Sequence, residues 1–191
     1  MRLFVALEIP AEVRGKLADL IQELRASPAP AGVKGPRWVR AENLHLTLKF
    51  IGESASERLA GIRAALAGVR SANQAELACR GLGFFPHEKR PQVLWAGLEA
   101  SPNLTQLVED IDAAVAQTGF ARETRGFSPH LTLARFDPPR LEGPLRAAIA
   151  QAAAREFGSF RACAFHLMES RTKPTGAEYT RIASFPFAAE V

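Results

Sequence analysis

The sequence predicts a duplicated fold of strands and helices, built as two similar lobes within one compact unit. The sequence contains two similar strand segments, NLHLTLKF at residues 43–50 and PHLTLARF at residues 129–136. Each copy lies in a half that follows the same order of strand, helix, motif strand, helix and strand. No long linker separates the halves. We therefore expect a single bilobal domain over residues 1–191, with an internal repeat of approximately 1–90 and 91–191.

The composition is that of an ordinary globular protein, with 47% hydrophobic and 23% charged residues. The formal charge of +4 favours a phosphate-bearing or polyanionic ligand but identifies none. Two cysteines, Cys79 and Cys163, are too few for a secreted disulfide scaffold, and both fall in predicted strands, where we expect them to be buried. No apolar run approaches the roughly 20 residues that cross a bilayer. We expect a cytoplasmic protein without a membrane partner.

The first half begins with a strand at residues 2–9 and a helix that has Pro10 in its first turn. Apolar residues at helical spacing support that helix: Val13, Leu17, Leu20, Ile21 and Leu24. The motif strand is expected over residues 44–51, ending at Gly52. Ser54 with Glu57 then predicts a capping box for a second helix. A third strand is expected at 76–80, ending in the glycine-rich segment 81–86.

The second half repeats this order. A strand at 92–98 precedes a helix that begins at Ser101-Pro102 and stops near Gly119. The remaining expected elements are the motif strand at 130–136, a helix opening at Gly143-Pro144, and strands at 160–170 and 179–187.

The motif strands carry the chemistry. Strict alternation puts His45 and Thr47 on one face, while Leu46, Leu48 and Phe50 take the other. The second copy does the same for His130 and Thr132. If the lobes pack with approximate two-fold symmetry, two imidazoles flank one point. Such a pair suits general acid–base catalysis and in-line phosphoryl transfer, with the threonine hydroxyls hydrogen-bonded to phosphate oxygens.

Other chemistries find little support in the residue pattern. Neither histidine has an Asp, Glu, Cys or second His at metal-ligand spacing, so we expect no metal site. A nucleophile elbow, a Walker loop and a dinucleotide-binding glycine pattern are all missing from the sequence, and we expect no cofactor.

Each candidate also has a structural interpretation. The histidines could be solvent-facing structural residues, and the threonines could simply favour strands. Arg135 could reach a substrate phosphate or cap a strand end, and Phe50 could stack on a nucleobase or fill the core. Basic residues upstream of the motifs could rim a cleft or be solvated; they are Lys34, Arg37, Arg40, Arg122 and Arg125. His87 is expected in a solvated loop and His166 as a structural histidine.

The paired motifs resemble the two-histidine (2H) phosphoesterase superfamily. Within it, the chain is similar to the RNA 2′,3′-cyclic phosphodiesterases, formerly called 2′-5′ RNA ligases. The likeness extends through nearly the whole chain, and further segments that carry it are residues 37–39, 42–53, 94–98, 129–135, 169–171 and Tyr179.

The resemblance implies a bilobal α+β fold with antiparallel sheets lining a central cleft, helices packed outside, and no metal. It also implies that His45 donates a proton to the leaving 3′ oxygen, and that His130 activates water to give a 2′-phosphate. Thr47 and Thr132 would hold the phosphate. By symmetry the residues alone do not say which histidine is the acid.

The resulting hypothesis is an enzyme, a metal-independent hydrolase that opens 2′,3′-cyclic phosphate ends of RNA. Its substrates would include tRNA fragments or small cyclic nucleotides, and we expect it to act as a monomer. Two alternatives stay open: a 2′-5′ RNA ligase running the reverse reaction, and a non-catalytic RNA-end-binding protein. Binding alone would be served better by Arg or Lys than by paired histidines.

Overall fold

A computed structural model of the chain describes residues 1–28, 35–69, 74–141, 143–174 and 176–187. The α-helices of this part are α1 (Ala11–Arg25), α2 (Leu59–Ala67), α3 (Pro102–Gln117) and α4 (Gly143–Gln151). Its strands are β1 (Arg2–Glu8), β2 (Arg37–Trp38), β3 (His45–Glu53), β4 (Ala75–Phe85), β5 (Val93–Ala100), β6 (His130–Arg135), β7 (Glu156–Ala162), β8 (Ala164–Lys173) and β9 (Gly176–Pro186). Two 3₁₀ turns, η1 (Ala41–Asn43) and η2 (Ser56–Arg58), precede β3 and α2. The predicted α+β class is confirmed.

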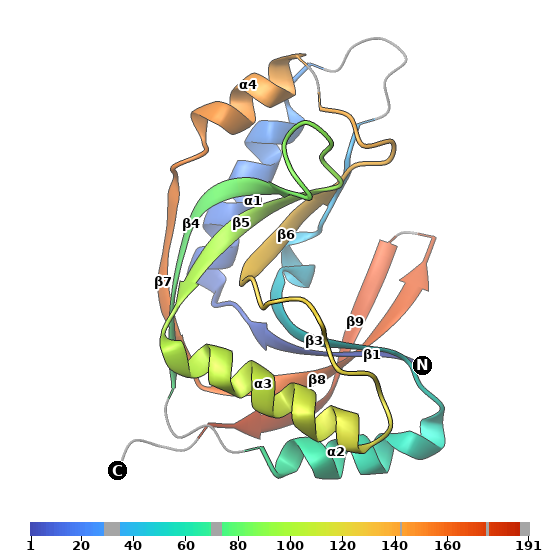
Figure 1. Cartoon of the computed structure of the whole chain (residues 1–191). Helices are drawn as coiled ribbons and strands as arrows, with labels where there is room; N and C mark the ends of the chain where they lie inside the picture. The colour runs from blue at the N-terminus through green and yellow to red at the C-terminus, as the bar shows by residue number, and fades with distance from the viewer. Residues whose placement is uncertain (29–34, 70–73, 142, 175, 188–191) are drawn as a thin grey trace.

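All the strands pair antiparallel, in the order β7-β4-β5-β6-β3-β1-β8-β9, with β2 added beside β6. The two motif strands, β3 and β6, meet at the centre of this path. Their pairing is a single bridge between Leu46 and Leu131. The sheet curls at this junction, so that one set of strands lies on each side of it (Figure 1).

The helices cover the outer face of the curled sheet at its two ends (Figure 1). Helix α3 packs on α2 and β3, whereas α1 packs on β7 and α4. Helix α1 belongs to the first half of the chain but packs on elements of the second half. Helix α3 belongs to the second half and packs on elements of the first. The exchange joins the two halves through shared apolar surface, since the predicted α1 stripe is buried throughout: Val13, Leu17, Leu20, Ile21 and Leu24.

Several predicted boundaries are wrong, each because tertiary pairing continues or interrupts an element. Gly52 does not end the motif strand, because glycine accepts φ +86° within β3 and the strand runs on to Glu53. The capping box at Ser54 does not form. The Ser54 hydroxyl donates to the Ala55 carbonyl, and α2 begins after η2 without a side-chain cap.

The segment 81–86 is likewise no simple loop, because β4 bends at Gly81 and continues pairing with β5 as far as Phe85. The strand expected at 160–170 is two strands, interrupted at Cys163, because β7 pairs with β4 while β8 pairs with β1. Pro10 is the N-cap of α1 rather than a residue of its first turn.

Candidate functional site

The first motif strand breaks its alternation just after Thr47. Across from it, Ala6 pairs with Thr47 but Val5 pairs with Lys49, so Leu48 is the extra residue of a β-bulge. The two residues directly after the bulge therefore change face. Lys49 becomes buried beside Leu48, and Phe50 turns outward with 61% of its surface exposed. The assignment of Phe50 to the apolar face is therefore wrong.

The second motif strand carries the same irregularity at the same place. Trp95 pairs with Thr132 while Leu94 pairs with Ala134, which leaves Leu133 as the extra residue. Arg135 is consequently exposed on the histidine face, at the position equivalent to Phe50. Strict alternation from His130 would have sent it to the opposite face.

The bridge between Leu46 and Leu131 determines how the two motifs meet. These leucines are the middle residues of the two His-Leu-Thr triplets. In an antiparallel pair, residues opposite each other point to the same face. This register therefore aligns His45 with Thr132 and Thr47 with His130, and it places both imidazoles on the same face of the sheet.

Both imidazole rings are oriented in the same way. The Nδ1 atom of His45 lies 2.7 Å from the carbonyl oxygen of Asn43, and Nδ1 of His130 lies 2.7 Å from that of Ser128. A carbonyl oxygen only accepts, so Nδ1 carries the proton and donates. This leaves Nε2 as the atom that gains or loses a proton in each ring. In His45 that atom lies 3.0 Å from Oγ1 of Thr47.

The pKa values of both histidines are lowered. Burial is the main cause in each case, and the backbone hydrogen bond at Nδ1 opposes it. The positive charge of Arg135 lowers both pKa values further, and His130 adds a smaller effect on His45. Two neutral imidazoles near a cation favour the arrival of an anionic ligand, whose charge would make protonation of one ring easier.

Aromatic residues that sequence reasoning did not assign to the site pack around the histidines. The ring of His45 contacts Phe4 at 4.9 Å and Tyr179 at 5.1 Å between centroids. His130 contacts Phe85 edge-on at 4.8 Å, and Phe85 in turn packs on Trp95. Only the family resemblance pointed to Trp95 and Tyr179; the alternation within β1 and β4 gave no signal for Phe4 or Phe85.

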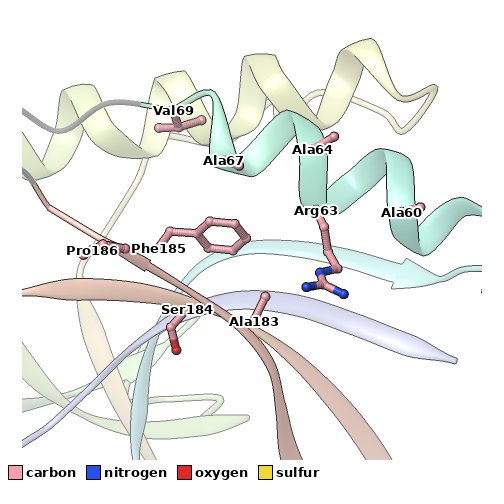
Figure 2. A pocket seen from close by; sticks show the side chains of 9 residues that line it. All are labelled: Ala60, Arg63, Ala64, Ala67, Val69, Ala183, Ser184, Phe185 and Pro186. Carbon is pink, nitrogen blue, oxygen red and sulfur yellow. The ribbon is translucent and has the colours of Figure 1, made fainter.

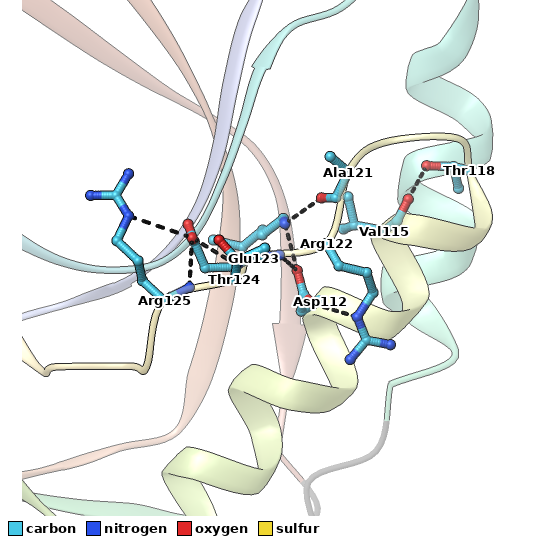
Figure 3. A network of polar contacts seen from close by, with 9 residues as sticks. Asp112, Val115, Thr118, Ala121, Arg122, Glu123, Thr124 and Arg125 are labelled. Carbon is cyan, nitrogen blue, oxygen red and sulfur yellow. Dashed lines mark hydrogen bonds and ion pairs between the residues drawn. The ribbon is translucent and has the colours of Figure 1, made fainter.

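The basic residues upstream of the motifs pair with acidic neighbours. Arg37 lies 3.9 Å from Asp137, and Arg40 lies 3.8 Å from Glu42. Arg122 and Arg125 take part in a network around the end of α3 (Figure 3). Their role as a cleft rim stays a prediction, and Lys34 lies outside the described residues.

That network has a buried ion pair at its centre. Lys49, turned inward by the bulge, donates from Nζ to Asp112 at 2.5 Å and to the Ala121 carbonyl at 2.8 Å. Asp112 also accepts from the Glu123 backbone N–H at 3.0 Å and from Arg122 at 2.7 Å. The pair therefore fixes the segment that leads from α3 to His130.

The remaining candidates are structural. His87 is exposed and His166 is buried with its Nδ1 3.0 Å from the Ser184 hydroxyl, as expected. Burial of Cys79 is confirmed, and it raises the pKa of that thiol to about 12, whereas Cys163 is exposed because it falls between β7 and β8.

No other feature of the described residues competes with the histidine face as a catalytic site. A hollow of about 620 Å³ lies between α2 and β9 (Figure 2). Four alanines line it together with Arg63, Val69, Ser184, Phe185 and Pro186, and neither His45 nor His130 is among its lining residues. Within the described ranges, no group of three or more His, Cys, Asp or Glu side chains is placed to hold a metal ion. No helix there is long and apolar enough to span a membrane.

Comparisons with known proteins find relatives that match nearly the whole chain. Residues 13–174 match the family model described as the 2′-5′ RNA ligase superfamily. A protein of Archaeoglobus fulgidus named RNA 2′,3′-cyclic phosphodiesterase is 31% identical, over 97% of this chain and 99% of that one. Two crystal structures each cover 98% of both chains. One is a protein of Thermus thermophilus (30% identity, TM-score 0.79), and the other is LigT of E. coli in complex with 3′-AMP (26%, 0.76).

Proposed function

The chain belongs to the 2′-5′ RNA ligase superfamily of 2H phosphoesterases, and from this premise we propose that it hydrolyses 2′,3′-cyclic phosphate ends of RNA to 2′-phosphates. One observation carries the proposal. Two His-x-Thr strands meet at a single bridge, and each presents an imidazole whose Nδ1 is fixed on a carbonyl while Nε2 is left to exchange a proton. This arrangement suits acid and base catalysis on opposite sides of one phosphorus atom.

In the proposed reaction, Nε2 of His130 accepts a proton from water as the water oxygen attacks phosphorus. The bond from phosphorus to the 3′ oxygen breaks on the far side. His45 donates its Nε2 proton to that leaving oxygen, giving a 3′-hydroxyl and a 2′-phosphate. The polarity of the pair comes from the family resemblance alone, because burial lowers the pKa of both histidines.

The other predicted site residues would hold the substrate. Thr47 and Thr132 flank the bridge and would donate hydroxyl hydrogen bonds to the non-bridging phosphate oxygens. Arg135 and Phe50 leave their strands at equivalent positions on the same face. The guanidinium would bind the phosphate, and the exposed phenyl ring would stack on a nucleobase. LigT of E. coli was crystallised in complex with 3′-AMP, which supports a nucleotide as the ligand of this chain.

We further propose that the reaction needs neither metal nor cofactor, because two imidazoles provide both proton transfers and Arg135 provides the positive charge. The chain would act as one unit, since a single path of paired strands runs through both halves. RNA ends, including those of tRNA fragments, and small cyclic nucleotides are the proposed substrates, and a monomer in the cytoplasm is the proposed form.

One assay tests the proposal. The protein is incubated with an oligonucleotide ending in a 2′,3′-cyclic phosphate, with EDTA present, and the product isomer is identified. We expect a 2′-phosphate. Loss of activity on chelation would contradict the metal-free mechanism, and a 3′-phosphate would reverse the assigned polarity. Binding without turnover would indicate an end-binding protein, while joining of ends in the same assay would favour the ligase that the superfamily's name suggests.

A further inference from the structure

We propose that the hydroxyl group of Tyr179 is a further binding group of this site and donates a hydrogen bond to an oxygen of the bound phosphate. The identity of the ligand rests on the proposed function. The argument for the residue itself comes from the β8–β9 hairpin, the packing of the ring and the charges around it.

The hairpin is attached to the site by one residue. The side-chain amide of Asn43 donates to the carbonyl oxygen of Ala177 in β9 at 2.7 Å. The backbone carbonyl of the same Asn43 accepts the Nδ1 proton of His45 at 2.7 Å. Asn43 therefore orients the imidazole and also holds β9 two residues before Tyr179. The position of Tyr179 relative to His45 is fixed by hydrogen bonds rather than by a loop.

The tyrosine ring packs directly on the histidine. Its centroid lies 5.1 Å from that of His45 with the two planes at 89°, and 5.1 Å from that of Phe4 at 71°. Such edge-to-face contacts are favourable and immobilise a ring. Because the ring is held against His45, the location of its hydroxyl group is restricted as well.

The packing of the Tyr179 ring does not require its hydroxyl group. Tyr179 is half-buried, and its hydroxyl is not among the buried polar atoms that lack a partner, so the group is open to a ligand. Among the described residues, the Tyr179 hydroxyl forms no hydrogen bond. The second histidine offers a direct contrast, because its edge-on neighbour is Phe85, which packs at 4.8 Å and 81° without any hydroxyl. A phenyl ring is therefore sufficient to support an imidazole in this fold, and the oxygen atom of Tyr179 is not needed for that packing.

The charges around the site favour an anion as the hydrogen-bond partner of the Tyr179 hydroxyl. The charge of Arg135, from the other motif strand, acts on His45, His130 and Tyr179, so the guanidinium lies within electrostatic range of all three side chains. Burial raises the pKa of Tyr179 above its ordinary value, with Arg135 and Arg2 opposing the shift. The phenol is therefore protonated at neutral pH and available as a donor. A protonated donor within range of a guanidinium and next to an imidazole matches a phosphate oxygen.

The experiment uses Tyr179→Phe, which keeps the ring and removes only the oxygen. Binding of adenosine 2′-monophosphate is measured by calorimetry, with Thr180→Val as the control for an exposed hydroxyl of the same strand. A hydrogen bond to a charged group is worth enough to weaken binding about tenfold or more. We expect that loss in Tyr179→Phe, and unchanged binding and thermal unfolding in the control. Equal affinity of Tyr179→Phe and the parent protein would overturn the proposal.

A second readout is spectroscopic. Tyr179 is the only tyrosine in the chain, so the phenolate absorbance band reports this hydroxyl alone. Saturation with adenosine 2′-monophosphate should move its ionisation to higher pH, because the phosphate dianion favours the protonated donor. An unchanged or lower ionisation pH in the saturated protein would contradict the contact.

These measurements separate the two proposals. If the parent protein binds the nucleotide through Tyr179 but does not open a cyclic phosphate, the proposed function fails and the tyrosine contact stands. If cyclic phosphate is opened and Tyr179→Phe binds and turns over like the parent, the tyrosine contact fails alone.

Discussion

The two motif strands β3 and β6 share their geometry and differ in their chemistry. Both present His-Leu-Thr-Leu, both insert a bulge at the second leucine, and both fix Nδ1 on a carbonyl two residues upstream. The residues after the bulge differ. The inward position holds Lys49 in β3 and Ala134 in β6, and the outward position holds Phe50 and Arg135.

The neighbouring strands differ as well. Opposite the histidines stand Glu8 in one case and Gly97 in the other, and opposite the threonines stand Ala6 and Trp95. The Trp95 indole packs directly on Gly83, where no larger residue fits, because a Cβ added to Gly83 would lie 2.2 Å from the indole. The comparison teaches that the residues which set backbone geometry are the same in both strands. The side chains that follow the bulge, and those of the neighbouring strands, are the ones that differ.

The largest expected effect tests whether the two strands are catalytically equivalent. His45→Ala and His130→Ala should each lower turnover of a cyclic phosphate by about 10²–10⁴-fold while the far-ultraviolet circular dichroism is unchanged. Because an acid and a base act on one transition state, the double variant should be little worse than the poorer single variant. A single variant with near-parent turnover would make that histidine structural.

The second prediction concerns the inward position, where the strands differ most in stability. Lys49→Met removes the ammonium group from a pair whose side chains are only 5% and 9% exposed. Breaking a buried pair should lower the free energy of unfolding by about 3 kcal/mol, measured in urea. The double variant Lys49→Met/Asp112→Leu should recover much of this loss, since no unpaired carboxylate is left. A single variant within about 0.5 kcal/mol of the parent would show that Arg122 and the Glu123 N–H suffice to compensate Asp112.

The same pair gives stability a pH dependence. Burial alone would raise the pKa of Asp112, but the Lys49 hydrogen bond, the Glu123 N–H and the charges of Lys49 and Arg122 lower it overall. The Asp112 carboxylate therefore binds a proton more readily in the unfolded chain than in the folded one. Its contribution to the free energy of unfolding is present above the unfolded pKa and is lost as the pH falls through the folded pKa. In Lys49→Met the free energy of unfolding should fall less on acidification than it does in the parent protein.

The third prediction concerns the outward position. Arg135→Gln should raise KM for the cyclic phosphate by about tenfold or more, because a charge-assisted contact to phosphate is lost. Phe50→Leu should have a smaller effect, about that of one stacked base at most, and should depend on which base carries the phosphate. Steady-state kinetics with adenosine and cytidine 2′,3′-cyclic phosphates measure both. Equal, base-independent effects of the two variants would contradict a division of roles between the strands.

The smallest expected effect is a shift of the pH profile. With one neutral and one protonated imidazole required, kcat/KM should follow a bell whose two apparent pKa values belong to the pair. Burial and Arg135 lower both histidine pKa values, so the bell of the free enzyme should lie on the acid side of pH 6.5. Removing the cation in Arg135→Gln raises these values and should move the bell to higher pH. Arg63→Gln on α2, whose charge is not among those that shift the pKa of either histidine, is the control, and an unmoved bell in Arg135→Gln would exclude the charge effect.

The sequence by itself determined the features that depend on near neighbours along the chain. The alternation in each His-Leu-Thr-Leu segment places histidine and threonine on one face, and the helical spacing of Val13 through Leu24 defines the buried side of α1. These patterns follow from the periods of strand and helix, which a few adjacent residues are enough to express. The repetition of the motif then pointed to two equivalent strands in one fold.

Only the tertiary structure decided the features that depend on a partner strand. A bulge exists only relative to the residues opposite, so the turn of Lys49 into the core and of Phe50 outward depends on how β3 pairs with β1. The exchange of α1 and α3 between halves and the bridge from Leu46 to Leu131 are likewise long-range contacts. Tyr179 reaches His45 across 134 positions only because β9 pairs with β8, β8 with β1, and Asn43 with Ala177. Such contacts are selected by the packing of the whole sheet, and no local period of the sequence encodes them.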